Sequence, residues 1–290
     1  MGPEHVDFGL ELCRIAGWNQ LPADWRRLMG LSPGGMFVAI EDGRLAGTAS
    51  VVSYGRMVGW IGMILVHPDF RGRGIGSTLM RTCIDTLRSR GVATIKLDAT
   101  DQGRPVYLKL GFIDERPIWR MQRSTGTQGD AGVLPAHVAG PAKSQPGEAP
   151  TRPVETDDWP AISNIDAVAF GADRTALLRH LAGAGTGLVF TQAGQIQAYG
   201  FYRRGFRASH IGPIVASAPA GAESIVGRLL DPAGPGSVFW DLFPENNPAR
   251  ELAESLGFSP IRKLTRMYLD EGGHDGDISQ VFAAAGFEIG

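Results

Sequence analysis

The sequence predicts an α+β fold, in which helices flank a mixed sheet, and it predicts that this fold occurs twice along the chain. Three observations support the prediction. A stretch without apolar periodicity divides the 290 residues into two segments of ordinary domain size. The first segment mixes helical, hairpin and strand patterns. The second segment repeats that order, which is typical of a duplicated unit.

The dividing stretch covers residues 124–150 and reads STGTQGDAGVLPAHVAGPAKSQPGEAP. It consists mostly of Gly, Ala, Pro, Ser and Thr and has few large side chains to bury, as is typical of a linker. We therefore expect one domain at residues 1–123, a linker at 124–150 and a second domain at 151–290.

Apolar spacing predicts the elements of the first segment in order. Two helical pieces between Phe8 and Met29 are separated by a break at residues 17–22, and Asp42-Gly43 between two β-rich runs is a strong hairpin signal. A third strand, a glycine loop and an amphipathic helix ended by Gly91 follow. The remaining expected elements are a strand at 93–99, a short helix at 104–110 and an extended region at 112–121.

Two stretches of the second segment match the first. At a constant offset of 150, residues 61–80 align with residues 211–230, and one Ile-Gly pair, two further Ile positions and one Leu coincide. Further on, the Leu-Gly-Phe of residues 110–112 corresponds to that of residues 256–258. One difference is that the opening strand predicted at residues 151–154 has no clear counterpart before Phe8.

Overall charge and cysteine content exclude several classes of protein. The chain has 28 Lys and Arg against 30 Asp and Glu, so no general positive field exists to hold a nucleic acid or an anionic membrane. Two cysteines cannot form a disulfide framework, and no leader or run of eighteen apolar residues is present. We expect a cytoplasmic protein that binds neither nucleic acid nor membrane.

The loop at residues 71–76 reads RGRGIG and lies between a strand and the first turn of a helix. The first amides of a helix lack intrahelical acceptors and attract anions, and glycines allow a close approach. A phosphate or pyrophosphate site is therefore expected; the alternative is a glycine-rich turn with surface arginines. The loop lacks the Lys of a nucleotide-triphosphate loop, and the hairpin before it argues against a dinucleotide fold.

Two signatures in order carry a resemblance to a known family. Residues 64–68 read ILVHP before the glycine loop, and residues 107–112 read YLKLGF after an intervening helix and strand. The segment from Met36 to Met121 thereby resembles the GNAT superfamily of acyl-CoA-dependent N-acyltransferases. The second segment resembles the same fold in a degenerate form, so the chain looks like two tandem GNAT domains.

The resemblance implies acetyl-CoA or another acyl-CoA as cosubstrate. Amides of the glycine loop would hold its pyrophosphate, and the backbone of the preceding strand would pair with the pantetheine arm. The amide of Val66 would polarise the thioester carbonyl. Thr100 stands where the family often has an Asn that contacts the cofactor, which weakens the match there. The cofactor-binding residues that we carry over are Ile64, Leu65, Val66, Arg71, Gly72, Arg73, Gly74, Ile75, Gly76 and Thr100.

The resemblance also implies that Tyr107 protonates the departing CoA thiolate; the alternative is a packing tyrosine. The sequence does not identify the general base. The candidates are Glu41, Asp98, Asp101, Glu115 and a chain of water molecules. The region that lines the acceptor pocket in this fold includes Trp18 and Asn19, and Trp119 comes from the last strand. No metal site is expected.

The second copy has lost the anion loop. Glu223 stands where Arg73 is, Val226 where Gly76 is, and Ala253 where Tyr107 is. Asn246 fits the family Asn that the first domain lacks. We infer one catalytic domain and one that completes the acceptor pocket, dimerises or stabilises the first; a homodimer is left open. The expected activity is direct acetyl transfer to a primary amine of a small molecule or peptide, the alternative being a non-catalytic acyl-CoA sensor or protein-interaction module.

Overall fold

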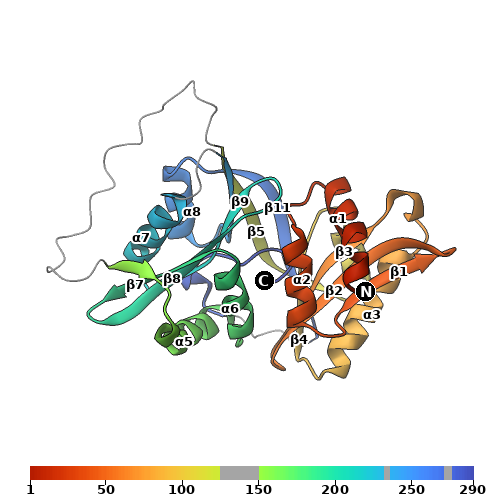
Figure 1. Cartoon of the computed structure of the whole chain (residues 1–290). Coiled ribbons are helices and arrows are strands. Elements are labelled where there is room, and N and C mark those ends of the chain that lie inside the picture. The colour runs from red at the N-terminus through yellow and green to blue at the C-terminus, as the bar shows by residue number, and fades with distance from the viewer. Residues whose placement is uncertain (125–149, 232–235, 271–275) are drawn as a thin grey trace.

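The computed structural model describes residues 1–124, 150–231, 236–270 and 276–290. The predicted linker therefore lies almost entirely outside the described residues. Figure 1 shows two halves side by side, with the C-terminus between them. We call residues 1–124 the first half and residues 150–290 the second half.

The first half follows the order of elements that the sequence predicts. Two helices separated by a break precede a hairpin, whose turn residues Asp42 and Gly43 have positive φ angles of 51° and 73°. Both positions need the left-handed region, which explains the Asp-Gly pair. The elements are α1 (Val6–Ile15), α2 (Pro22–Leu31), β1 (Met36–Glu41), β2 (Arg44–Tyr54), β3 (Val58–Val66), α3 (Ile75–Ser89), β4 (Thr94–Ala99), α4 (Arg104–Lys109) and β5 (Ile113–Ser124).

The second half repeats this plan, so the predicted duplication is confirmed. Its order from β9 to β11 matches that from β3 to β5. The elements are β6 (Thr151–Pro153), α5 (Trp159–Phe170), α6 (Thr175–Ala184), β7 (Thr186–Gln192), β8 (Gln195–Arg203), β9 (Ser209–Ala216), α7 (Pro219–Leu230), β10 (Ser237–Leu242), α8 (Asn247–Ser255), β11 (Ser259–Asp270) and β12 (Val281–Ala283). The opening strand β6 lacks a first-half counterpart among the described strands; there the Met1 amino group donates to the Met36 carbonyl at 3.1 Å.

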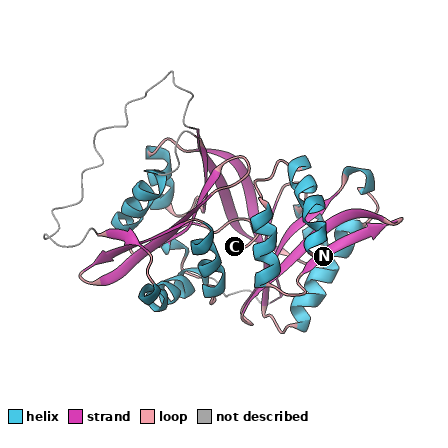
Figure 2. Ribbon diagram, in the orientation of Figure 1, coloured by secondary structure: helices cyan, strands magenta, loops and turns pink. Residues whose placement is uncertain are grey.

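One mixed sheet runs through both halves. Its strand order is β1-β2-β3-β4-β11-β5-β10-β9-β8-β7-β6, with β12 paired to β9. The final strand of the first half, β5, lies between β11 and β10 of the second half, and β11 lies between β4 and β5. The corresponding strands β5 and β11 thus each lie beside strands of the other half. Figure 2 shows these strands as a continuous layer with helices on its faces.

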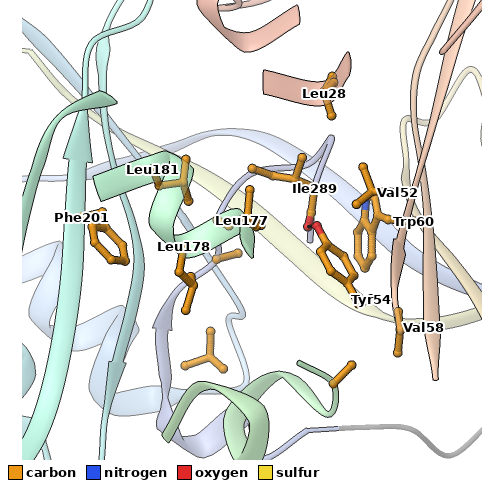
Figure 3. Packing of buried hydrophobic residues seen from close by; sticks show 14 of the residues in the cluster. Leu28, Val52, Tyr54, Val58, Trp60, Leu177, Leu178, Leu181, Phe201 and Ile289 are labelled. Atoms are coloured by element: carbon orange, nitrogen blue, oxygen red, sulfur yellow. Dashed lines mark hydrogen bonds between the residues drawn. The ribbon is translucent and has the colours of Figure 1, made fainter. Parts of the chain in front are cut away.

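The hydrophobic core is shared at the boundary between the halves. One cluster combines α2, β2 and β3 of the first half with α5, α6 and β8 of the second half. Figure 3 shows Ile289, from the C-terminal segment, between Leu177 and Leu181 of α6 and Val52 and Trp60 of the first half. Two further clusters form around α3 and α7; the first also includes Met267 and Leu269 of β11, and the second Met121 of β5. The halves are therefore joined by apolar packing as well as by the sheet.

The C-terminal segment after β12 is held by hydrogen bonds to its backbone carbonyls. Trp60 donates to Phe287 at 3.0 Å, and Tyr54 donates to Ile289 at 2.6 Å. Arg174, itself buried, donates to Gly290 at 2.8 Å. Residues 284–290 thereby lie against β3 of the first half. Among the described helices, none has the length and apolar content that crossing a membrane requires.

Candidate active site

The site begins where two parallel strands separate. β3 and β4 are paired at Val58, Gly59 and Trp60, and then diverge. A bulge in β3 follows: Met63 is buried with a φ of 54°, and its carbonyl accepts from the Thr48 hydroxyl at 2.9 Å. Bulges bend a strand and re-aim its edge. Residues 61–66 therefore present a backbone edge that β4 does not pair.

A cavity of about 1100 Å³ follows this free edge to the glycine loop and to α4. It is lined by nine of the ten residues predicted to bind the cofactor: Ile64, Leu65, Val66, Arg71, Gly72, Gly74, Ile75, Gly76 and Thr100. Arg73 is the exception, because its guanidinium lies 3.7 Å from Asp42 and 5.3 Å from the Phe70 ring. Tyr107 also lines the cavity.

The backbone of the glycine loop has free donors. Within the described residues, the amides of residues 72–77 have no backbone or side-chain acceptor, and the next amide, Thr78, donates to Gly74 at 3.0 Å. Gly72 and Gly74 have φ angles of 77° and 81°, which L side chains rarely adopt. Six successive unpaired amides thus lie at the N-terminus of a fifteen-residue helix, an arrangement whose chemistry suits an anion.

Tyr107 and Thr100 lie at the far end of this cavity. Burial raises the pKa of Tyr107 to about 12, so the phenol stays protonated at neutral pH. The Thr100 hydroxyl accepts from the Gly103 amide at 3.1 Å and so begins the turn into α4. This hydroxyl keeps its proton free to donate.

A second, smaller cavity of about 90 Å³ adjoins the first. Five residues line both cavities: Trp18, Ile64, Thr100, Tyr107 and Arg262. The smaller cavity is further lined by Gln20, by Asp98 and Arg120, and by Phe287 and Glu288 of the C-terminal segment. Both halves of the molecule thus form its wall.

The three residues expected to bind the acceptor are placed differently. Trp18 lines both cavities. The Asn19 side chain instead accepts from the amides of Arg207 and Ala208 and donates to the Ala208 carbonyl, which fastens the two halves together. Trp119 lies 4.7 Å from the Lys263 ammonium and packs against the core of the second half. Its neighbour on β5, Arg120, faces the cavity, because successive strand residues point to opposite faces.

The candidate bases also separate. Asp101 lines the large cavity and Asp98 the small one, whereas Glu41 and Glu115 are absent from both linings within the described residues. The Asp98 carboxylate accepts from the Nε and Nη2 atoms of Arg266 at 2.9 and 3.0 Å. Burial raises the pKa of Asp98, against the lowering effect of Arg266. Sequence reasoning missed Arg262 and Glu288, which come from β11 and the C-terminal segment.

The second half lacks a corresponding loop among its described residues. The helix α7 begins at Pro219, so residues 223–226, which match the end of the glycine loop, lie inside the helix. Asn246 caps α8 by accepting from the Ala249 amide and donates to carbonyls of residues 278, 279 and 281. Its hydrogen bonds are thereby used within the fold.

The strand gap of the second half is filled by the chain itself. β9 and β10 are paired from Ser209 to Ile211 and then diverge as β3 and β4 do. β12 pairs with β9 beyond that point, Trp240 donates to the Phe282 carbonyl at 2.7 Å, and Ala284 donates to the Asp241 carbonyl at 2.8 Å. β12 therefore occupies the position where the first half has its cavity.

No group of three or more His, Cys, Asp and Glu side chains among the described residues is arranged to hold a metal ion.

Two sequence-family matches follow the two halves. The Acetyltransferase (GNAT) family matches residues 11–112, and an Acetyltransferase (GNAT) domain matches residues 162–283. The chain belongs to the GNAT superfamily of acyl-CoA-dependent N-acetyltransferases. Its splayed strands, glycine loop and Tyr107 all lie within the first match, and the filled gap of the second half lies within the second.

Individual proteins agree with this assignment. The uncharacterized N-acetyltransferase YitH of Bacillus subtilis is 28% identical over 260 residues, covering 88% of this chain and 85% of YitH. A glucosamine 6-phosphate N-acetyltransferase of Trypanosoma brucei brucei is 34% identical over 110 residues, covering 36% of this chain and 69% of that protein. A Pyrococcus horikoshii protein assigned as an acetyltransferase shares the fold, with a TM-score of 0.80 and 21% identity over 100% of this chain and 94% of its own.

Proposed function

We propose that this GNAT protein transfers an acetyl group from acetyl-CoA to a primary amine of a small molecule or peptide, directly and in a ternary complex. The observation that supports the proposal best is the continuity of the two cavities. The unpaired amides lie along the large cavity, and Tyr107 and four other residues line its junction with the small one. One cavity would take the cosubstrate and the other the acceptor, so that both reactants meet at the junction.

Different groups of the first half would bind the cosubstrate, stabilise the oxyanion and donate the proton. Amides of residues 72–77 would bind the pyrophosphate, and the free edge of β3 would pair with the pantetheine arm. The amine nitrogen attacks the thioester carbon, the new C–N bond forms, and the C–S bond breaks. The amide of Val66 would stabilise the developing oxyanion. Tyr107 would donate its proton to the departing thiolate, which suits a phenol that burial keeps protonated.

The test is release of free CoA from acetyl-CoA across a panel of amino acids, amino sugars, polyamines, aminoglycosides and peptides. Acetyl transfer to at least one amine is expected. The Tyr107→Phe variant should bind CoA normally and turn over roughly 100-fold more slowly, as loss of a general acid does. Tight CoA binding without release by any amine would contradict the proposal and support a non-catalytic acyl-CoA sensor. Unchanged turnover in Tyr107→Phe would remove Tyr107 from the mechanism.

A further inference from the structure

The smaller cavity contains four charged side chains, and two of them are neutralised by close partners. Asp98 is paired with Arg266. Arg120 is paired with Asp241, to which two of its nitrogens donate at 2.7 Å each. The two other charged residues of the cavity, Arg262 and Glu288, have no such ion pair among the described residues.

The Glu288 carboxylate has no ion-pair partner and receives no hydrogen bond from another side chain within the described residues. The residue is 8% exposed and lines the cavity. Its main chain is fixed on both sides, by Trp60 at Phe287 and by Tyr54 at Ile289. Burial raises the pKa of Glu288, against the lowering effect of Arg203. A buried carboxylate held in this way is suited to receive a proton from a bound amine.

Arg262 carries the opposite charge at the junction of the two cavities. No described residue forms an ion pair or a hydrogen bond with its guanidinium. It lies on β11 two residues from Leu264, which also lines the small cavity, so both side chains share one face of the sheet. Burial lowers the pKa of Arg262, and the nearby charge of Arg120 lowers it further. An anion bound beside Arg262 would stabilise the charged guanidinium and so oppose both of these effects on its pKa.

Gln20 supplies a third unsatisfied group. Its Oε1 atom is buried and lacks a hydrogen-bond donor, and the side chain lines the same cavity. A buried acceptor without a partner is costly unless a ligand or water donates to it. The Gln20 Oε1 atom and the Glu288 carboxylate are acceptors, to which an ammonium group or an amine can donate, whereas the Arg262 guanidinium is a donor only.

We propose that the acceptor is a small molecule that carries both an amine and an anionic group, with Glu288 as the general base for the amine and Arg262 as the ligand of the anion. This inference rests on the proposed acetyl transfer. The ammonium gives one proton to the Glu288 carboxylate, and the freed nitrogen lone pair forms the C–N bond. As the C–S bond breaks and Tyr107 protonates the thiolate, the nitrogen loses a second proton, which returns to the Tyr107 oxygen. The anion would be a carboxylate or a phosphate, because both match the guanidinium fork. The small volume leaves room for only a few atoms, so larger acceptors extend into the main cavity.

The experiment compares matched amines with the unmodified protein. The pairs are an amino acid and its amide, ethanolamine and phosphoethanolamine, and glucosamine and glucosamine 6-phosphate. We expect the anionic member of at least one pair to show a kcat/KM roughly 10 to 100-fold above its neutral member. Carboxylate and phosphate members tell which anion is used. Acetylation of neutral and anionic members at equal rates would overturn the inference and leave the proposed function intact; absence of acetyl transfer to any amine would overturn the proposed function instead.

Variants assign the two roles separately. Arg262→Gln should raise KM for the anionic acceptor and abolish the preference within the pair, because kcat/KM should fall much more for the anionic member than for the neutral one. Glu288→Gln should lower kcat roughly 100-fold, and Glu288→Asp should restore part of it. The controls are Arg204→Gln and Glu251→Gln, which change exposed side chains of the second half. Full activity of Glu288→Gln, or an unchanged preference in Arg262→Gln, would contradict the assignments; should either variant fail to fold, the amine pairs still decide the inference.

Discussion

The two halves of this GNAT protein solve the same structural problem in different ways. In each half two parallel strands separate, β3 from β4 and β9 from β10, and the separation leaves backbone groups that need partners. In the second half β12 supplies those partners. In the first half the edge lies along the large cavity, beside six unpaired amides. The same separation of strands is thus closed by the chain itself in one half and left open to a cavity in the other.

The filling of the second gap also has a consequence for the first half. The segment that follows β12 crosses to β3 and brings Phe287 and Glu288 into the wall of the small cavity. The second half therefore contributes to the site of the first, rather than keeping one of its own. Buried residues of both halves, Tyr54 and Arg174, hold this segment in place.

The largest effect on CoA affinity is expected from a substitution in the glycine loop of the first half, where we propose the anion site. Gly74→Glu adds a carboxylate beside the free amides and forces an L side chain into a φ of 81°. The strain costs about 1–3 kcal/mol, and charge repulsion adds to it, so CoA affinity should fall roughly 100-fold or more. The measurement is calorimetric titration with CoA. The matched control is Glu223→Ala at the aligned segment of the second half, and a loss of affinity there equal to that in Gly74→Glu would show that the two segments are equivalent.

In the second half, a smaller effect is expected from His210, which should make the stability of the protein depend on pH. Burial and nearby Arg203 lower the pKa of His210 to about 4, and His210 bonds to Asp241 at 3.1 Å next to β12. The unfolded chain protonates this histidine below about pH 6.5, whereas the folded chain keeps it neutral. The free energy of unfolding should therefore decrease as pH falls from about 6.5 to 4, by on the order of a few kcal/mol from this residue.

Urea unfolding at pH 7.5 and pH 5 measures this effect. The variant His210→Asn should be less stable at neutral pH and should lose much less further stability on acidification than the unmodified protein does. An identical loss of stability in both proteins between the two pH values would show that His210 does not carry the linkage.

Local patterns were enough to predict much of the fold. The hairpin at Asp42-Gly43, the helix that starts at Ile75 and the duplication depend on spacing within a few residues or on a repeat, so they can be read directly. The loop residues and Tyr107 follow from motifs of the same kind, and nine of ten predicted cofactor residues line one cavity.

The remaining features depend on contacts between residues far apart in the chain. The exchange of β5 and β11 is a choice of strand partner, and any strand of suitable pattern could occupy either place. Glu288 lies 181 residues after Tyr107, in a short apolar segment with no motif, and only the hydrogen bonds of its neighbours bring it to the cavity. Asn19 illustrates the reverse case: its neighbours Trp18 and Gln20 line the small cavity, whereas its own side chain joins the two halves by hydrogen bonds.

The number of CoA molecules bound per chain distinguishes a protein with one cosubstrate site, in the first half, from a protein with a site in each half. Calorimetric titration of the full-length protein should give one site per chain, and Gly74→Glu should remove it. Two sites per chain, or one site that survives Gly74→Glu with unchanged affinity, would contradict an account in which the first half holds the cosubstrate and β12 fills the gap of the second.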